Sequence, residues 1–221
     1  MKKLLPAMFV ALLMVGCGDP DEEENSFGWS DANKPASTGV LDLDDKIREA
    51  KENKATVLDL QNTSSKESGI IDITSLAELT ELESLDLSFN RITDVSPLAR
   101  LTKLKKLELI DNPITNLTPL AGLTQLTELW LGGNRITDVS PLARLPRLET
   151  LDLSMNQITD ITPLEGLREM KKLLIFENKI TDLRPLARMK NLRILHIYFN
   201  SIPEDQKAML RNALPDCKIR F

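Results

Sequence analysis

The stretch "LTELESLDLSFNRITDVSPLAR", residues 79–100, decides the fold, because it recurs at once as "LTKLKKLELIDNPITNLTPLAG", residues 101–122. The recurrence is marked by six asparagines at intervals of 22 residues: Asn90, Asn112, Asn134, Asn156, Asn178 and Asn200. A proline follows each of the first five by seven residues, and Leu or Ile lies three and five residues before every one. A period in this range predicts a solenoid in which each repeat forms one coil.

Each recurring residue type has a physical reason. The alternation Leu85–Asp86–Leu87 predicts a short strand with one buried face, and successive strands would stack about 4.8 Å apart in a parallel sheet. The asparagine side chain can satisfy backbone groups in the turn that follows, and asparagine tolerates unusual dihedral angles. The six asparagines are therefore predicted to form a structural ladder. Pro97 and its equivalents fix φ at the start of a 3₁₀ turn on the far side of the coil.

The unit L-x-x-L-x-L-x-x-N-x-I-x-D-x-x-P-L-x-x-L resembles the leucine-rich repeat, and its Thr-Asp-x-x-Pro-Leu version is similar to the bacterial internalin type. The resemblance implies an α/β solenoid, a horseshoe with a parallel β-sheet on its concave face, short 3₁₀ turns on its convex side and helical caps. The repeats would span residues 57–202 as one degenerate and six regular coils, which makes seven strands. The degenerate coil carries five extra residues within "NTSSKESG", residues 62–69.

Both ends of the solenoid need caps, because a raw end would expose the core and a sheet edge. Residues 40–56 predict an N-terminal helical cap with Leu43, Ile47 and Ala50 on its apolar side. Residues 203–221 predict a C-terminal cap: a helix that starts near Pro203, and a final strand or extended edge in "CKIRF", residues 217–221. We expect Cys217 to be buried there.

The N-terminal region predicts export. Residues 1–16 combine two lysines with a short apolar run, as in a signal peptide, and "LMVGC" resembles a bacterial lipobox that ends at Cys17. The resemblance implies a palmitate-bearing lipoprotein anchored through Cys17 to the outer face of the cell membrane or to the outer membrane. Residues 17–39 are rich in acidic residues, Pro, Gly and Ser and predict a flexible tether.

The variable positions of the strands indicate function, since they project from the face of the sheet opposite the core. We predict a partner-binding surface on the concave face: Asp86, Glu108, Trp130, Asp152, Leu174, Phe176, His196 and Tyr198. Early coils carry carboxylates and later coils carry large apolar groups, a composition typical of protein-binding surfaces. Gly132 and Gly133 predict a dent beside Trp130.

Two functional hypotheses follow: binding of a protein or peptide partner, or a structural or assembly role in the bacterial cell envelope without a specific ligand on this face. Stacked aromatic residues also stabilise a sheet without a partner, so both stay open. The formal charge of -5 argues against nucleic acid binding. We expect no enzymatic activity, catalytic residue, metal site or cofactor, because the single histidine, His196, has no nucleophile beside it in the pattern. We also expect a monomer.

Overall fold

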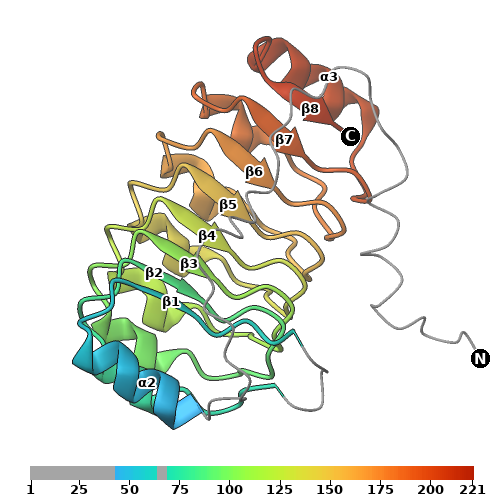
Figure 1. Ribbon diagram of the computed structural model, residues 1–221. Helices are drawn as coiled ribbons and strands as arrows, with labels where there is room; N and C mark the ends of the chain where they lie inside the picture. The colour runs from blue at the N-terminus through green and yellow to red at the C-terminus, as the bar shows by residue number, and fades with distance from the viewer. Residues whose placement is uncertain (1–42, 64–68) are drawn as a thin grey trace, which may run out of the picture. The chain divides into compact units, whose positions relative to one another are not determined.

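The computed structural model describes residues 43–63 and 69–221 (Figure 1). The predicted signal peptide, Cys17 and the tether lie outside the described residues. Eight strands form one parallel sheet in chain order, each paired with the next. The strands are β1 (Val57–Asp59), β2 (Ser84–Asp86), β3 (Lys106–Glu108), β4 (Glu128–Trp130), β5 (Thr150–Asp152), β6 (Lys172–Leu174), β7 (Ile194–His196) and β8 (Lys218–Arg220). The parallel sheet is confirmed, with one strand more than the seven counted, because β8 in the C-terminal region pairs with β7.

The core of the solenoid lies behind the sheet and consists of aliphatic side chains contributed by every coil. The central residue of each strand points inward, and Leu85, Leu107 and Leu129 are register partners with at most 1% exposure. Leu87 and its equivalents three residues before each asparagine are equally buried. Each fully buried leucine contributes roughly 1.5–3 kcal/mol of transfer free energy, so the repeated leucines supply the main stabilisation.

On the side of the core opposite the sheet, each coil forms a short 3₁₀ helix. These are η3 (Thr74–Glu78), η4 (Ser96–Arg100), η5 (Thr118–Gly122), η6 (Ser140–Arg144), η7 (Thr162–Gly166) and η8 (Arg184–Arg188). From η4 onward a proline occupies the first turn, as predicted, and the leucine after it is buried. The predicted 3₁₀ turns are confirmed.

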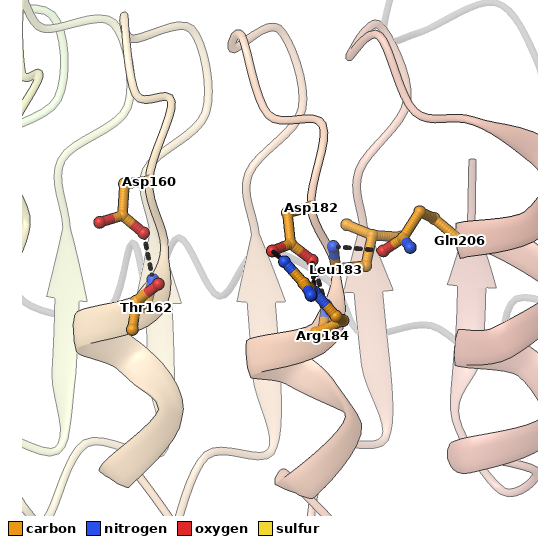
Figure 2. A network of polar contacts seen from close by, with 6 residues as sticks. All are labelled: Asp160, Thr162, Asp182, Leu183, Arg184 and Gln206. Carbon is orange, nitrogen blue, oxygen red and sulfur yellow. Dashed lines mark hydrogen bonds and ion pairs between the residues drawn. The ribbon is translucent and has the colours of Figure 1, made fainter.

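An exposed column of side chains, here called the outer row, starts these 3₁₀ helices: Asp72, Asp94, Asn116, Asp138, Asp160 and Asp182. Each accepts a hydrogen bond from the backbone N–H two residues later, at 2.8–2.9 Å. Figure 2 shows two of these turns, at Asp160 and Asp182. Such local bonds start a helix by satisfying an orphan backbone N–H group.

The six asparagines of the repeat form a second column, here called the inner ladder, and its first four members are buried. The amide nitrogen of Asn134 donates to the carbonyl oxygens of Leu109, Leu131 and Gly132 at 2.9–3.3 Å. Its amide oxygen accepts from the N–H of Ile114 in the preceding coil at 3.1 Å. Each side chain of the ladder therefore ties its own turn to the coil before it.

The first coil departs from this regularity by five residues. Asn112 bonds to the carbonyl of Leu87, 25 residues earlier, whereas Asn90 bonds to the carbonyl of Leu60, 30 residues earlier. The bond from Ile70 N–H to Asn90 keeps the usual spacing of 20 residues. The extra residues therefore lie between Leu60 and Ile70. Residues 64–68 of this segment are outside the described part, and so is the protruding loop predicted for it.

Helices lie at both ends of the described repeats (Figure 1). Helix α2 (Leu43–Glu52) buries Ile47 and Ala50 and contacts η3. Helix α3 (Glu204–Ala213) follows Pro203, buries Leu210 and contacts η8. The side chain of Gln206 accepts the N–H of Leu183 at 3.0 Å, as Figure 2 shows. The C-terminal helix thus supplies a polar partner to the last coil.

Cys217 lies between α3 and β8 and is half-buried, where it packs against the core. Burial raises the pKa of its thiol to about 11. The thiol is therefore protonated at neutral pH and has little nucleophilic character. Cys217 is thus less buried than expected, although it packs against the core as a cap residue would.

Candidate binding face of the sheet

The candidate site is the sheet surface that points away from the core, here called the open face. It is built from the first and third residues of every strand, since successive side chains of a strand alternate between the two faces. The first positions are Val57, Ser84, Lys106, Glu128, Thr150, Lys172, Ile194 and Lys218. The third positions are Asp59, Asp86, Glu108, Trp130, Asp152, Leu174, His196 and Arg220.

The structure brings the predicted surface residues together in two adjacent rows. Six of them occupy third positions of β2–β7 and are register partners in sequence, from Asp86 across to His196. Phe176 and Tyr198 lie two residues further along, after β6 and β7. Two of the eight offer little surface, because Asp152 is 8% and Phe176 5% exposed. The remaining six are partly exposed.

Carboxylates dominate the end of the open face at β1–β3. Burial raises the pKa of Asp86, and the neighbouring carboxylate of Asp59 raises it further. Burial also raises the pKa of Glu108, although Lys106 Nζ lies 2.9 Å from its Oε1. The outward positions of β1–β3 hold three carboxylates and one amine. Like charges on adjacent strands oppose each other's ionisation.

Trp130 stands at the middle of the open face. The ammonium group of Lys172 lies 5.4 Å from the centroid of its ring, within the range of a cation–π contact. The indole Nε1 is buried and has no hydrogen-bond acceptor among the described residues. A buried N–H donor without an acceptor costs about 1–3 kcal/mol, so this group lowers the stability of the folded state.

Asp152 fills the space beside Trp130 that the two glycines were predicted to leave open. Its Oδ1 accepts from the backbone N–H and the hydroxyl of Ser154, at 2.8 and 2.6 Å. A Cβ atom on Gly132 would lie 2.9 Å from Oδ2 of Asp152. The predicted dent is therefore wrong: the missing side chain at Gly132 makes room for the carboxylate of the next coil. Burial raises the pKa of Asp152.

An aromatic cluster follows the strands β6 and β7. Phe176 and Tyr198 stack with centroids 4.6 Å apart and planes 11° apart. Phe199 meets Tyr198 edge-on, with centroids 5.1 Å apart, and is 73% exposed. Burial raises the pKa of Tyr198 as well, so its phenol stays protonated at neutral pH. The cluster presents one exposed ring, that of Phe199, beside the partly exposed Tyr198 and the buried Phe176.

The backbone is left-handed at the residue before each asparagine from Asn90 to Asn200. Positive φ values of 52–70° occur there at Phe89, Asp111, Gly133, Met155, Glu177 and Phe199. The unusual dihedral angle expected of the asparagines thus belongs to their predecessors, because the turn reverses one residue earlier. Four of these six residues are neither Gly, Asn nor Asp, the types that adopt this region most readily.

The sequence interpretation missed the basic residues of the open face. Lys218 and Arg220 belong to β8, which had been read only as part of the cap, and register pairing places Arg220 beside His196. Lys106 and Lys172 occupy the first positions of β3 and β6, a row that holds none of the predicted surface residues. Applying the strand alternation to every row, and to the C-terminal cap, would have found all four.

No group of three or more His, Cys, Asp or Glu side chains within 43–63 and 69–221 is arranged to hold a metal ion. In the same ranges, the helices are too short or too polar to cross a membrane.

Comparisons with known proteins agree with this geometry. The family model for leucine-rich repeats (two copies) matches residues 80–122 and 124–166. An internalin (inlF) of Listeria monocytogenes is 37% identical with a TM-score of 0.67; the match covers 71% of this chain and 46% of that one. Internalin C2 of the same species is 35% identical with a TM-score of 0.57, over 74% of this chain and 80% of that one.

A more distant match is the leucine-rich repeat ectodomain of the plant receptor kinase GASSHO1/SCHENGEN3 from Arabidopsis thaliana, solved in complex with CASPARIAN STRIP INTEGRITY FACTOR 2. It is 27% identical with a TM-score of 0.57, over 67% of this chain and 19% of that one. No curated protein matches the chain by sequence. The chain spans less than half of the length of internalin inlF. By its repeats and by these matches, the chain belongs to the leucine-rich repeat proteins and is structurally similar to the bacterial internalins.

Proposed function

We propose that this chain binds a protein or peptide partner on the open face of its sheet. The observation that carries the proposal is Phe199, which is 73% exposed and has a φ of 55°. Leucine-rich repeat folds commonly serve as protein–protein interaction modules, and internalin-like ones are typically not enzymes. We therefore assign no catalytic residue.

The fold by itself gives no reason for a phenylalanine at position 199. Asp111, Gly133 and Glu177 hold the same turn position in other coils, so the geometry accepts small or polar residues. A bulky residue in the left-handed region carries a backbone cost of about 1–2 kcal/mol, and its exposed ring gains little from burial. An accessible aromatic ring on a partly buried base is the usual form of an anchor for a partner.

One observation favours the second candidate function, a structural or assembly role in the cell envelope. Phe176 is buried beneath its contact with Tyr198, so this pair stabilises adjacent coils without any partner. The ring of Phe199 contributes little to the stacked pair. Removing this ring should weaken partner binding if the binding function holds, and should have no such effect if the role is structural.

The proposed site of action is the bacterial cell envelope. The lipobox-like "LMVGC" supports lipidation of Cys17 and attachment to the outer face of the cell membrane or to the outer membrane. Growth with an alkyne analogue of palmitate should label the wild-type protein and leave a Cys17→Ser variant unlabelled. Equal labelling of both proteins would contradict lipidation at Cys17.

The binding function is tested by photocrosslinking from position 199, where the ring of Phe199 contacts Tyr198 beside the open face. We would place p-benzoylphenylalanine at position 199 in the full-length chain, irradiate cells and identify the crosslinked protein. The same probe at position 52 is the control, because Glu52 is an exposed residue of α2 and lies away from the open face.

Affinity for the identified protein is then measured for Phe199→Asn and Phe89→Asn. Asparagine suits the left-handed backbone, so both variants should fold at least as stably as the wild type. We expect Phe199→Asn to weaken binding at least about tenfold, in the range of interface hot spots. Unchanged affinity of a folded Phe199→Asn variant would favour the structural role instead.

A further inference from the structure

The charges of the open face are segregated along the sheet. The outward positions of β1–β3 hold three carboxylates and one amine: Asp59, Asp86, Glu108 and Lys106. The outward positions of β6–β8 hold three cations and no carboxylate: Lys172, Lys218 and Arg220, with Leu174, Ile194 and His196 between them. One end of the face is therefore acidic and the other basic, with Trp130 between them.

We propose that the partner presents an extended peptide segment with opposite charges at its two ends, which lies across the strands. Its basic end would cover β1–β3, and its acidic end would cover β8. This inference rests on the proposed binding function and names the chemistry of the ligand. A segment laid the other way would place like charges together at both ends of the face, which disfavours that orientation.

The dimensions of the sheet set the length of the segment. The eight strands make seven steps of about 4.8 Å, so the open face spans about 34 Å. An extended chain advances about 3.3 Å per residue, and about ten residues would therefore bridge the face. A segment of this length fits between the acidic and basic ends without folding back.

The middle of the face offers two further contacts. The partly exposed ring of Trp130 offers apolar surface between the two charged ends of the face. Phe199 and Tyr198 offer ring surface for an apolar side chain in the second half of the segment. The central part of the ligand would therefore be apolar, between its two charged ends.

A positively charged group of the partner would stabilise the carboxylates at the acidic end of the open face. Asp86 and Glu108 are register partners on adjacent strands, and both are half-buried. Burial raises the pKa of each carboxyl group, and repulsion from a neighbouring carboxylate raises it further, from Asp59 for Asp86 and from Asp86 for Glu108. A lysine or arginine of the partner would neutralise this repulsion, whereas an acidic residue would add to it.

The test uses labelled synthetic peptides of about twelve residues with one shared composition: three Lys, three Asp, a central Tyr-Leu pair and Ser elsewhere. Two peptides carry the charges in separate blocks, in either order, and a third alternates them. Binding to the full-length protein is measured by fluorescence anisotropy. We expect the better of the two block peptides to bind at least about tenfold more tightly than the alternating one.

Charge-reversal variants of the protein then test which end of the open face contacts which end of the peptide. Asp86→Lys/Glu108→Lys should weaken the block peptide at least about tenfold, and should favour a peptide with Asp at both ends. Lys218→Glu/Arg220→Glu provides an independent reversal at the opposite end, where the residues are exposed and the folded state is less at risk. The control is Glu52→Lys/Glu169→Lys, which makes the same charge change away from the open face and should leave the affinity within about twofold.

Two outcomes would overturn the inference. Equal affinity for block and alternating peptides would show that the face does not read charge order. No detectable binding of any peptide would show that the ligand is not an extended segment of this kind. Neither result decides the proposed function, because the crosslink from position 199 reports a partner of any shape and charge.

Discussion

The inner ladder and the outer row are two polar columns with the same period and opposite surroundings. Asn134 of the inner ladder is 7% exposed and makes four hydrogen bonds, three of them to carbonyl oxygens. Asn116 of the outer row is exposed and accepts a single bond from Thr118. The same residue type thus holds two coils together in one column and only starts a 3₁₀ helix in the other.

The difference shows that burial, and not periodicity, decides what a repeated polar residue contributes. Other members of the outer row are aspartates, since one acceptor oxygen is all that the turn requires. Every member of the inner ladder is asparagine, because its position needs donors and an acceptor at once. An aspartate there would face carbonyl oxygens with a negative charge.

The largest effect is expected for Asn134→Asp. The substitution removes the donors to the carbonyls of Leu109 and Leu131 and places a carboxylate in a buried position. We expect a loss of about 3–5 kcal/mol in the free energy of unfolding at pH 7, as for other uncompensated buried charges. Urea denaturation followed by circular dichroism measures it, and a loss below about 1 kcal/mol would contradict the role given to the ladder.

Asn134→Ala and Asn116→Ala form the matched pair for the same comparison. Asn134→Ala leaves the N–H of Ile114 without its acceptor, and we expect a loss of about 2–4 kcal/mol. The carbonyls of Leu109 and Leu131 keep a bond from Asn112 and Asn156, which limits the loss. Asn116→Ala should cost only about 0.5–1 kcal/mol, as for a weak cap. Equal losses in parallel urea titrations would contradict the comparison.

Removing carboxylate charges should change the stability by a smaller amount that depends on pH, and with opposite sign on the open face and in the outer row. The pKa values of Asp86 and Glu108 are raised in the folded protein, so their charged forms oppose folding. Asp86→Asn/Glu108→Gln should therefore raise the melting temperature at pH 7. This gain should shrink as the pH falls through the raised pKa values, and vanish below the ordinary values of 3.8 and 4.5.

Removing outer-row carboxylates should lower the melting temperature at pH 7, the opposite of the effect expected for Asp86 and Glu108. Hydrogen bonds from Ser96 lower the pKa of Asp94, and those from Thr162 lower that of Asp160. Their stabilising contribution is complete above the ordinary pKa of 3.8 and is lost as the pH falls through the lowered values. Thermal melts of Asp94→Ala/Asp160→Ala against wild type should show a deficit at pH 7 that narrows only under acidic conditions; a constant deficit would refute this assignment.

The smallest effect is expected for Asn116→Asp. Asp94 and Asp138 hold the same turn in the neighbouring coils, so we expect a change within about 0.5 kcal/mol. Set beside Asn134→Asp, this substitution makes an identical chemical change in a different environment. A similar loss at both positions, measured by urea denaturation, would mean that the two columns are not distinguished by burial.

Much of the fold could be predicted from the chain because each coil repeats the same local pattern. The leucines of the strands, the prolines of the 3₁₀ turns and the ladder asparagines all follow from spacing. The identity of the turn residue with the unusual dihedral could not be read in this way. Phe89, Met155 and Phe199 occupy the left-handed region although their side chains give no sign of it. The turn imposes it, since the asparagine side chain must point inward to reach three carbonyl oxygens.

The candidate site was predicted less completely, because its members come from different coils. Register pairing adds Arg220 to the row of Asp86, although the residue lies in the C-terminal cap of the sequence. Asp152 and Phe176 were predicted to face a partner, yet both are buried. Asp152 enters the space left by Gly132, and Phe176 lies against Tyr198.

The sequence by itself determined the coil, since the alternation within a strand and the spacing of Leu, Asn and Pro act over a few residues. It also determined which side of each strand can be exposed. Only the tertiary structure decided which side chains meet on that side, because neighbours across the sheet are separated by 22 residues along the chain. Their exposure depends on the size and charge of those neighbours, as Gly132 and Asp152 show. The segregation of charge along the open face likewise appears only when β8 takes its place in the sheet.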